Sequence, residues 1–166
     1  FERPEKLLNT SEKLSIARIV DLDGDGRNDL CYLASNGQET IFCARLQDQQ
    51  GKLGAELQFD VKRQRSLTTE NIDGDPGDEI LTIDPLTNRV KVLKLVKSQQ
   101  QAGELAGKLV QYGFGGSEGA RDRDLAIGDI DADGKIDIVA TDPSGAQVFV
   151  FRQTENSGLD LGTAFP

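Results

Sequence analysis

The chain contains 166 residues, of which 37% are hydrophobic, and it carries a formal net charge of −9. This length is sufficient for a domain with its own hydrophobic core. The acidic balance disfavours nucleic acid as a partner, because no basic face emerges to neutralise phosphates, and no apolar run approaches the ~20 residues of a transmembrane segment.

Residues 1–13 are expected to form an N-terminal arm, and a mild helical pattern covers only residues 5–14. The sequence starts at Phe1 without an initiator methionine or a signal peptide, which indicates a processed chain or a piece of a longer one. From residue 15 onward, strand signals dominate.

Three groups of strand-like segments follow the arm. The segments are rich in β-branched and aromatic residues and are bounded by Gly, Pro, Asn and Asp, which is typical of strands and turns. The expected strands are residues 15–20, 30–34, 39–45 and 56–61, then 67–70, 80–83, 89–96 and 108–112, then 125–127, 136–140 and 146–151. We predict an all-β fold of three four-stranded antiparallel repeats, with boundaries at 14–62, 63–118 and 119–166.

Each repeat carries one acidic loop between its first two strands. Loop one (residues 21–29), loop two (71–79) and loop three (129–137) start at intervals of 50 and 58 residues, which is the spacing of a repeat protein. Each loop places oxygen-bearing side chains at its positions 1, 3, 5 and 9. Alternate carboxylates can converge on a hard cation, and Ca²⁺ prefers several oxygen ligands at once. Asp and Gly also favour ordinary turns, but three copies in register between strands favour metal binding.

The loops differ from an EF-hand, which shares their opening residues. An EF-hand needs a bidentate Glu at position 12 and helices on both sides. Position 12 is occupied here by Tyr32, Thr82 and Ala140, and the flanking segments are strand-like.

Loop length, repeat length and the apolar strand that follows each loop together resemble the FG-GAP or VCBS repeat, the blade of integrin-α-type β-propellers. The resemblance covers about residues 14–160. It implies that each loop surrounds one Ca²⁺ with the side chains at positions 1, 3, 5 and 9 and the backbone carbonyl at position 7, so that up to three ions are bound. The implied ligands are Asp21, Asp23, Asp25, Arg27 and Asp29 in loop one, Asn71, Asp73, Asp75, Gly77 and Glu79 in loop two, and Asp129, Asp131, Asp133, Lys135 and Asp137 in loop three.

Loop two departs from this pattern. Asn71 opens it, Pro76 replaces the glycine at position 6, and Glu79 replaces the closing aspartate. The loop loses one formal charge and some conformational freedom, so we expect the weakest calcium affinity there. Mg²⁺ is less suitable than Ca²⁺ at all three loops, because it demands a tighter octahedron and retains water.

Cys31 and Cys43 flank a predicted turn at Asn36-Gly37. A three-residue connection from Asn36 to Gln38 places the cysteines opposite each other on adjacent strands. Two interpretations stay open: a disulfide at a non-hydrogen-bonded pair, or two buried thiols that pack as small hydrophobes.

The sequence contains no histidine, which removes Ser-His-Asp and Cys-His catalysis and most zinc sites. We therefore expect no catalytic residues. Calcium is expected to be structural, because a cation between close carboxylates removes their repulsion. The resemblance implies that the chain acts in extracellular, periplasmic or cell-surface recognition or assembly. Propellers have about 4–8 blades, so a protein partner or a second copy would complete the ring, and carbohydrate is a further candidate ligand. The alternative is an accessory or substrate-binding part of a larger secreted enzyme, such as a carbohydrate-active or redox enzyme.

Overall fold

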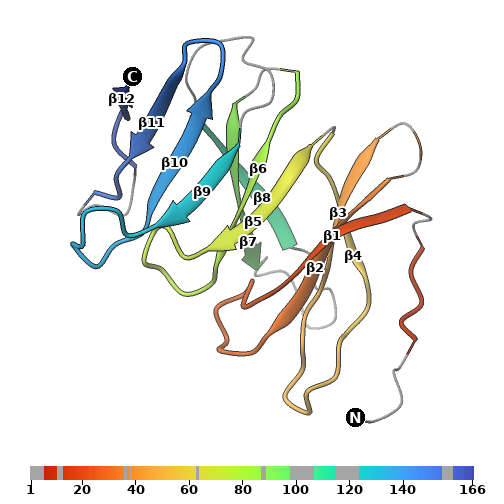
Figure 1. Ribbon diagram of the computed structural model, residues 1–166. Helices are drawn as coiled ribbons and strands as arrows, with labels where there is room; N and C mark the ends of the chain where they lie inside the picture. Colours follow the sequence, from red (N-terminus) through yellow and green to blue (C-terminus); the bar gives the residue numbers. More distant parts are fainter. Residues whose placement is uncertain are drawn as a thin grey trace.

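The protein is all-β, with three four-stranded antiparallel sheets arranged side by side (Figure 1). The computed structural model describes residues 6–10, 13–35, 37, 39–62, 64–86, 89–97, 107–114, 124–154 and 159–166. Within these ranges there is no helix that could cross a membrane. The strands of each sheet follow one another in chain order, so each strand pairs with the strands next to it in the sequence.

Sheet one contains β1 (Lys13–Val20), β2 (Asp29–Ser35), β3 (Thr40–Arg45) and β4 (Leu57–Asp60). Sheet two contains β5 (Arg65–Glu70), β6 (Glu79–Ile83), β7 (Val90–Lys97) and β8 (Gly107–Phe114). Sheet three contains β9 (Leu125–Gly128), β10 (Asp137–Asp142), β11 (Gln147–Phe151) and β12 (Thr163–Phe165).

All eleven expected strands are present, with bounds that differ by a few residues. The twelfth strand, β12, is implied by three four-stranded repeats but was not located in the sequence, because it has only three residues and all of them are exposed. Residues 6–9 have no regular secondary structure, so the mild helical pattern near the N-terminus does not correspond to a helix there.

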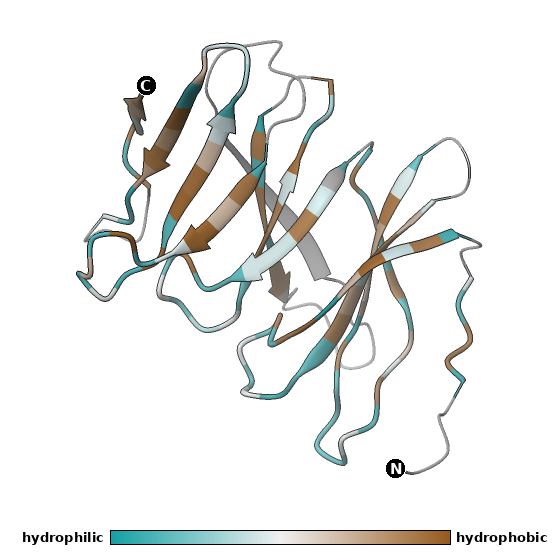
Figure 2. Ribbon diagram, viewed as in Figure 1, coloured by the Kyte–Doolittle hydropathy of each residue, from teal (hydrophilic) through white to brown (hydrophobic). Residues whose placement is uncertain are grey.

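Two hydrophobic clusters hold the three sheets together. The first lies between sheets one and two and includes Leu22, Phe42, Leu67 and Ile80. The second lies between sheets two and three, where Ile72 belongs to the same cluster as Ile83, Ile138 and Phe151. Figure 2 shows the apolar residues concentrated on the strands and the polar ones on the connecting loops. Each sheet therefore buries a face against its neighbour, as successive strand residues point to opposite faces.

Residues of the N-terminal arm cover the other face of sheet one. Arg45 donates hydrogen bonds to the carbonyl of Leu8 and to the side chain of Asn9, which also accepts one from the Tyr32 hydroxyl. The Thr10 hydroxyl donates to Glu56 at 2.6 Å. The arm is thus anchored by a polar cluster rather than by a helix.

The structure decides between the two interpretations of the cysteines. In the β2–β3 pairing, Cys31 lies opposite Ala44 and Cys43 lies opposite Tyr32, so the cysteines are offset by one residue. A one-residue offset sends side chains to opposite faces of a sheet, and the two thiols belong to different hydrophobic clusters. Neither cysteine is in a disulfide, and both are buried, so the structure contradicts the disulfide interpretation and supports that of two packed thiols.

The three acidic loops lie along one edge of the molecule, at the lower left of Figure 1. Each joins the first and second strands of its sheet: β1 to β2, β5 to β6 and β9 to β10. The first strands of sheets one and two, β1 and β5, also contact each other. Equivalent positions of the three loops can therefore be compared directly.

Candidate metal sites

Loop one is folded around the side chain of Asp21. Its carboxylate accepts hydrogen bonds from the backbone amides of Gly24 (2.8 Å), Asp25 (3.1 Å) and Gly26 (2.8 Å). Gly24 and Gly26 have φ values of 73° and 81°, a left-handed conformation that glycine adopts without the steric cost of a Cβ atom. The short polar loop thus closes on its own first residue.

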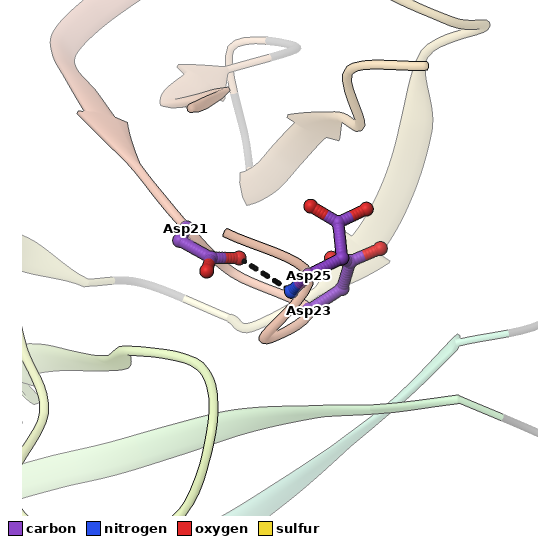
Figure 3. Close-up of side chains that lie close together, drawn as sticks. All are labelled: Asp21, Asp23 and Asp25. Atoms are coloured by element: carbon purple, nitrogen blue, oxygen red, sulfur yellow. Dashed lines mark hydrogen bonds between the residues drawn. The ribbon is translucent and has the colours of Figure 1, made fainter. Parts of the chain in front are cut away.

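Three carboxylates converge in loop one. Ligand oxygens of Asp21, Asp23 and Asp25 all lie within 4.8 Å of one another, and Figure 3 shows these side chains at the turn of the loop, with the Asp25 amide bonded to Asp21. The Arg27 guanidinium forms an ion pair with Asp25. Three oxygen ligands from alternate residues are a suitable partial shell for a hard cation.

Loop three also contains a triad of carboxylates, but its third member comes from loop position 9 instead of position 5. Asp129, Asp131 and Asp137 bring carboxylate oxygens within 4.8 Å of one another, and Asp129 accepts the amides of Asp133 (3.1 Å) and Gly134 (2.9 Å). Asp133 is outside the triad. It accepts hydrogen bonds from the backbone amide (2.8 Å) and the side-chain amine (3.2 Å) of Lys135. The hydrogen bond from the backbone amide lowers the pKa of this exposed carboxyl.

The carboxylate at position 9 closes each loop from the buried side. Asp29, Glu79 and Asp137 are each 1% exposed. Each accepts the backbone amide at position 2, from Leu22, Ile72 and Ile130 respectively, at 2.9 to 3.1 Å. Asp29 and Asp137 also accept an amide from the segment just after the third strand of their sheet, at Gln47 and Gln153.

Burial raises the pKa of Asp29, the hydrogen bonds from the Gln47 and Leu22 amides lower it, and the charges of Asp23 and Asp25 raise it again. The ionised form of this buried group is therefore destabilised by burial and by its carboxylate neighbours. A divalent cation among these carboxylates would relieve the repulsion.

Loop two has a different backbone and a different partner. Pro76 occupies position 6, where loops one and three have left-handed glycines, and Gly77 adopts the left-handed conformation instead, with φ of 98°. Proline cannot make this conformation, because its ring holds φ near −65°. Asn71 accepts the Gly74 amide at 2.7 Å, while its own amide group donates to the Asp75 carbonyl at 2.7 Å.

Lys94 from β7 reaches the carboxylates of loop two. Its amine nitrogen lies 2.5 Å from Asp73 Oδ2, 3.0 Å from Glu79 Oε1 and 3.8 Å from Asp75 Oδ2. Burial lowers the pKa of Lys94, but hydrogen bonds to Asp73 and Glu79 outweigh this effect and raise it. The ammonium ion is thus held in its charged form among these acids.

The structure therefore gathers six of the implied ligands into two triads, in loops one and three. Asp29 and Asp133 lie in these loops outside the triads, and the carboxylates of loop two meet at Lys94. Coordination by the carbonyls of Arg27, Gly77 and Lys135 stays a prediction. Lys94 was not predicted from the sequence. Its only signal is its place in β7, because the pairing of Ile80 with Leu93, continued by one residue, sets Lys94 across from Glu79.

No family model, curated protein or solved structure matches the chain.

Proposed function

We propose that the chain is a calcium-stabilised, non-catalytic β-propeller segment of the FG-GAP/VCBS type that serves recognition or assembly. One observation carries the proposal: two Asp triads occupy the same loop of two similar four-stranded sheets. A recurrent ligand set on a recurrent scaffold favours a common ion and a common structural purpose.

Calcium fits these loops better than magnesium. The triads consist of carboxylates on short loops, and Ca²⁺ accepts 6–8 oxygen ligands in flexible geometry, whereas Mg²⁺ demands a near-ideal octahedron. Backbone carbonyls and water would complete the shell. Extracellular calcium modules have dissociation constants of about 0.1–1 mM. We propose that these loops bind calcium in this range and that the chain acts in an extracellular, periplasmic or cell-surface location.

The proposed role of the ion is structural. Asp29 and Asp137 begin β2 and β10, and they accept amides from Gln47 and Gln153, which follow β3 and β11. An ion bound beside them would join the loop, the second strand and the segment that leaves the third strand of the same sheet. Because the unfolded chain lacks this arrangement, calcium would stabilise the folded state by mass action.

The assembly role is supported by the outer face of sheet three. At loop position 2, Leu22 is 1% exposed and Ile72 is 5% exposed, because each packs between its own sheet and the next one. Ile130 at the same position of loop three is 53% exposed, and Val148 on β11 is also exposed. We propose that another blade, from a partner protein or a second copy of this chain, covers this face.

Two measurements on one sample test the proposal. Calorimetric titration with Ca²⁺ is expected to detect binding that the paired variant Asp23→Asn/Asp131→Asn loses. Light scattering is expected to give a calcium-dependent dimer if the second copy supplies the missing blade, and a monomer if another polypeptide does. No calcium binding by the folded wild-type chain would refute the proposed function.

A further inference from the structure

We infer that Lys94 is the built-in cation of loop two, so that this loop binds no calcium and the protein takes two ions rather than three. The inference rests on the proposed function of loops one and three as calcium sites. Loop two keeps the acidic residues of the repeat, but their charge is met from within the chain.

The strand pairing explains why a lysine at this position reaches the loop. The last pairs before loop position 9 are Leu30 with Arg45, Ile80 with Leu93 and Ile138 with Phe151. Continued by one residue, this register places Leu46 in sheet one, Lys94 in sheet two and Arg152 in sheet three across from position 9. The three sheets thus place different side chains at one equivalent point beside their loops.

The three side chains at this point differ in how far they neutralise the loop. Leu46 is apolar and packs against the cluster between sheets one and two. Among the residues that the structure describes, Arg152 forms its ion pair with Asp131, at 3.1 Å, and both side chains are 38% exposed. Lys94 reaches three carboxylates and has a side chain that is only 18% exposed. Of these three side chains, Lys94 therefore neutralises the most carboxylate charge in its loop.

The position of the amine excludes a divalent ion. Lys94 contacts Asp73 and Glu79, whose side chains are 21% and 1% exposed, whereas the more distant Asp75 is 73% exposed. A calcium ion needs oxygens at about 2.3–2.6 Å, so it would have to occupy the place of the ammonium group. Both cations cannot share that place, because their repulsion at such a distance is severe.

The other departures of loop two agree with a monovalent occupant. Asn71 supplies one charge fewer than Asp21 or Asp129, and its amide group is directed to the Asp75 carbonyl. Glu79 has one methylene group more than Asp29 or Asp137. With this length, its Oε2 accepts the Ile72 amide at 3.0 Å while its Oε1 meets Lys94 at 3.0 Å.

The test is the number of calcium ions bound by the wild type and by Lys94→Met, measured by equilibrium dialysis with Ca²⁺. Methionine removes the charge and keeps an unbranched chain. The wild type is expected to bind two ions and Lys94→Met three. The charge-conserving Lys94→Arg is expected to bind two. Lys91→Met is the matched control, since Lys91 is on the same strand and pairs with Asp84 at 2.9 Å, away from the loop; it is expected to bind two.

Without calcium, Lys94→Met leaves Glu79 buried beside Asp73 without its cation, and the variant can fail to fold. In that case, the test uses variants that keep Lys94 and change one aspartate in each loop. Asp23→Asn and Asp131→Asn are each expected to lower the number of bound ions by one, whereas Asp73→Asn at the same loop position leaves it at two. Loss of an ion in Asp73→Asn would overturn the inference.

The outcomes separate this inference from the proposed function. Three ions on the wild type, or two on folded Lys94→Met, would overturn the assignment of Lys94 and leave the calcium sites intact. No ion on the wild type and one on Lys94→Met would refute the proposed function while supporting the role of Lys94. No ion on either folded protein would refute both.

Discussion

Gly24 of loop one lies directly against Pro76 of loop two. A Cβ atom at Gly24 would lie 2.7 Å from the Cβ and the carbonyl carbon of Pro76, and the Asp78 amide donates a hydrogen bond to the Asp21 carbonyl at 2.7 Å. Pro76, which departs from the repeat pattern of loop two, therefore packs against Gly24 of loop one. The first acidic loop depends on the second for its shape, even if only one of them binds an ion.

This contact predicts a difference between two glycine substitutions in loop one. Gly24→Ala and Gly26→Ala both place a Cβ atom at positive φ, which costs about 1–2 kcal/mol, but only the first meets Pro76, since the space around Gly26 is open. Overpacking at Gly24 adds about 1–3 kcal/mol. Urea unfolding followed by circular dichroism measures both losses, and equal losses would contradict the contact.

The residues at loop position 2 predict a graded series of truncations. Leu22→Ala and Ile72→Ala remove buried side chains from the clusters between sheets, and each is expected to cost about 2–5 kcal/mol. Ile130→Ala is expected to cost less than about 1 kcal/mol, because Ile130 is largely exposed and exposed substitutions have small effects. Unfolding at low protein concentration provides the comparison. A large loss at Ile130 under these conditions would contradict its exposed placement.

Glu56 predicts a pH dependence of stability. Burial raises the pKa of Glu56, but hydrogen bonds from Thr10, Tyr32 and Gln58 outweigh it and lower the pKa to about 2, from 4.5. A depressed carboxyl pKa stabilises the fold above the unfolded value, and this contribution is lost as the pH falls from 4.5 toward 2.

The variant Glu56→Gln isolates this contribution. The free energy of unfolding of the wild type is expected to exceed that of Glu56→Gln by about 1–3 kcal/mol at neutral pH, and the difference is expected to shrink as the pH approaches 2. Urea titrations at several pH values provide the measurement. A difference that does not change with pH would show that the charge of Glu56 does not anchor the arm.

The cysteines predict a pattern of chemical labelling. Burial raises the pKa of Cys31 to about 12, and both thiols are 0% exposed. Since the thiolate is the reactive form, neither cysteine is expected to react with a thiol reagent in the native protein, and both are expected to react in urea without a reductant. A disulfide in the purified chain, or rapid labelling of the native protein, would disagree with the observed register.

Much of this architecture could be predicted from the sequence, because the relevant signals are local. Alternating β-branched residues predict strands, and Asp and Gly at fixed offsets predict the loops between them. The side chain of Asp21 organises its loop through amides only three to five residues away. Local signals of this kind require no knowledge of how the sheets meet.

The features that were missed depend on register or on neighbouring strands. The β2–β3 connection pairs Ser35 with Thr40, one residue away from the pairing that would set Cys31 opposite Cys43. Lys94 is separated from Glu79 by a whole hairpin and meets it only because β6 and β7 pair in one register. The strand β12 has no apolar alternation of useful length, since it contains three exposed residues. None of these properties is contained in a short stretch of sequence.

The most direct test of the account is the melting temperature of the wild-type chain in Ca²⁺, in Mg²⁺ and in excess EDTA. Calcium at 100 times its dissociation constant would add about 2.7 kcal/mol per site, which corresponds to an increase of several degrees for a chain of this size. We expect the highest melting temperature in Ca²⁺, a smaller gain in Mg²⁺, and no gain from Ca²⁺ in Asp23→Asn/Asp131→Asn. Identical melting curves for the wild type in Ca²⁺ and in EDTA would contradict the claim that calcium stabilises this fold.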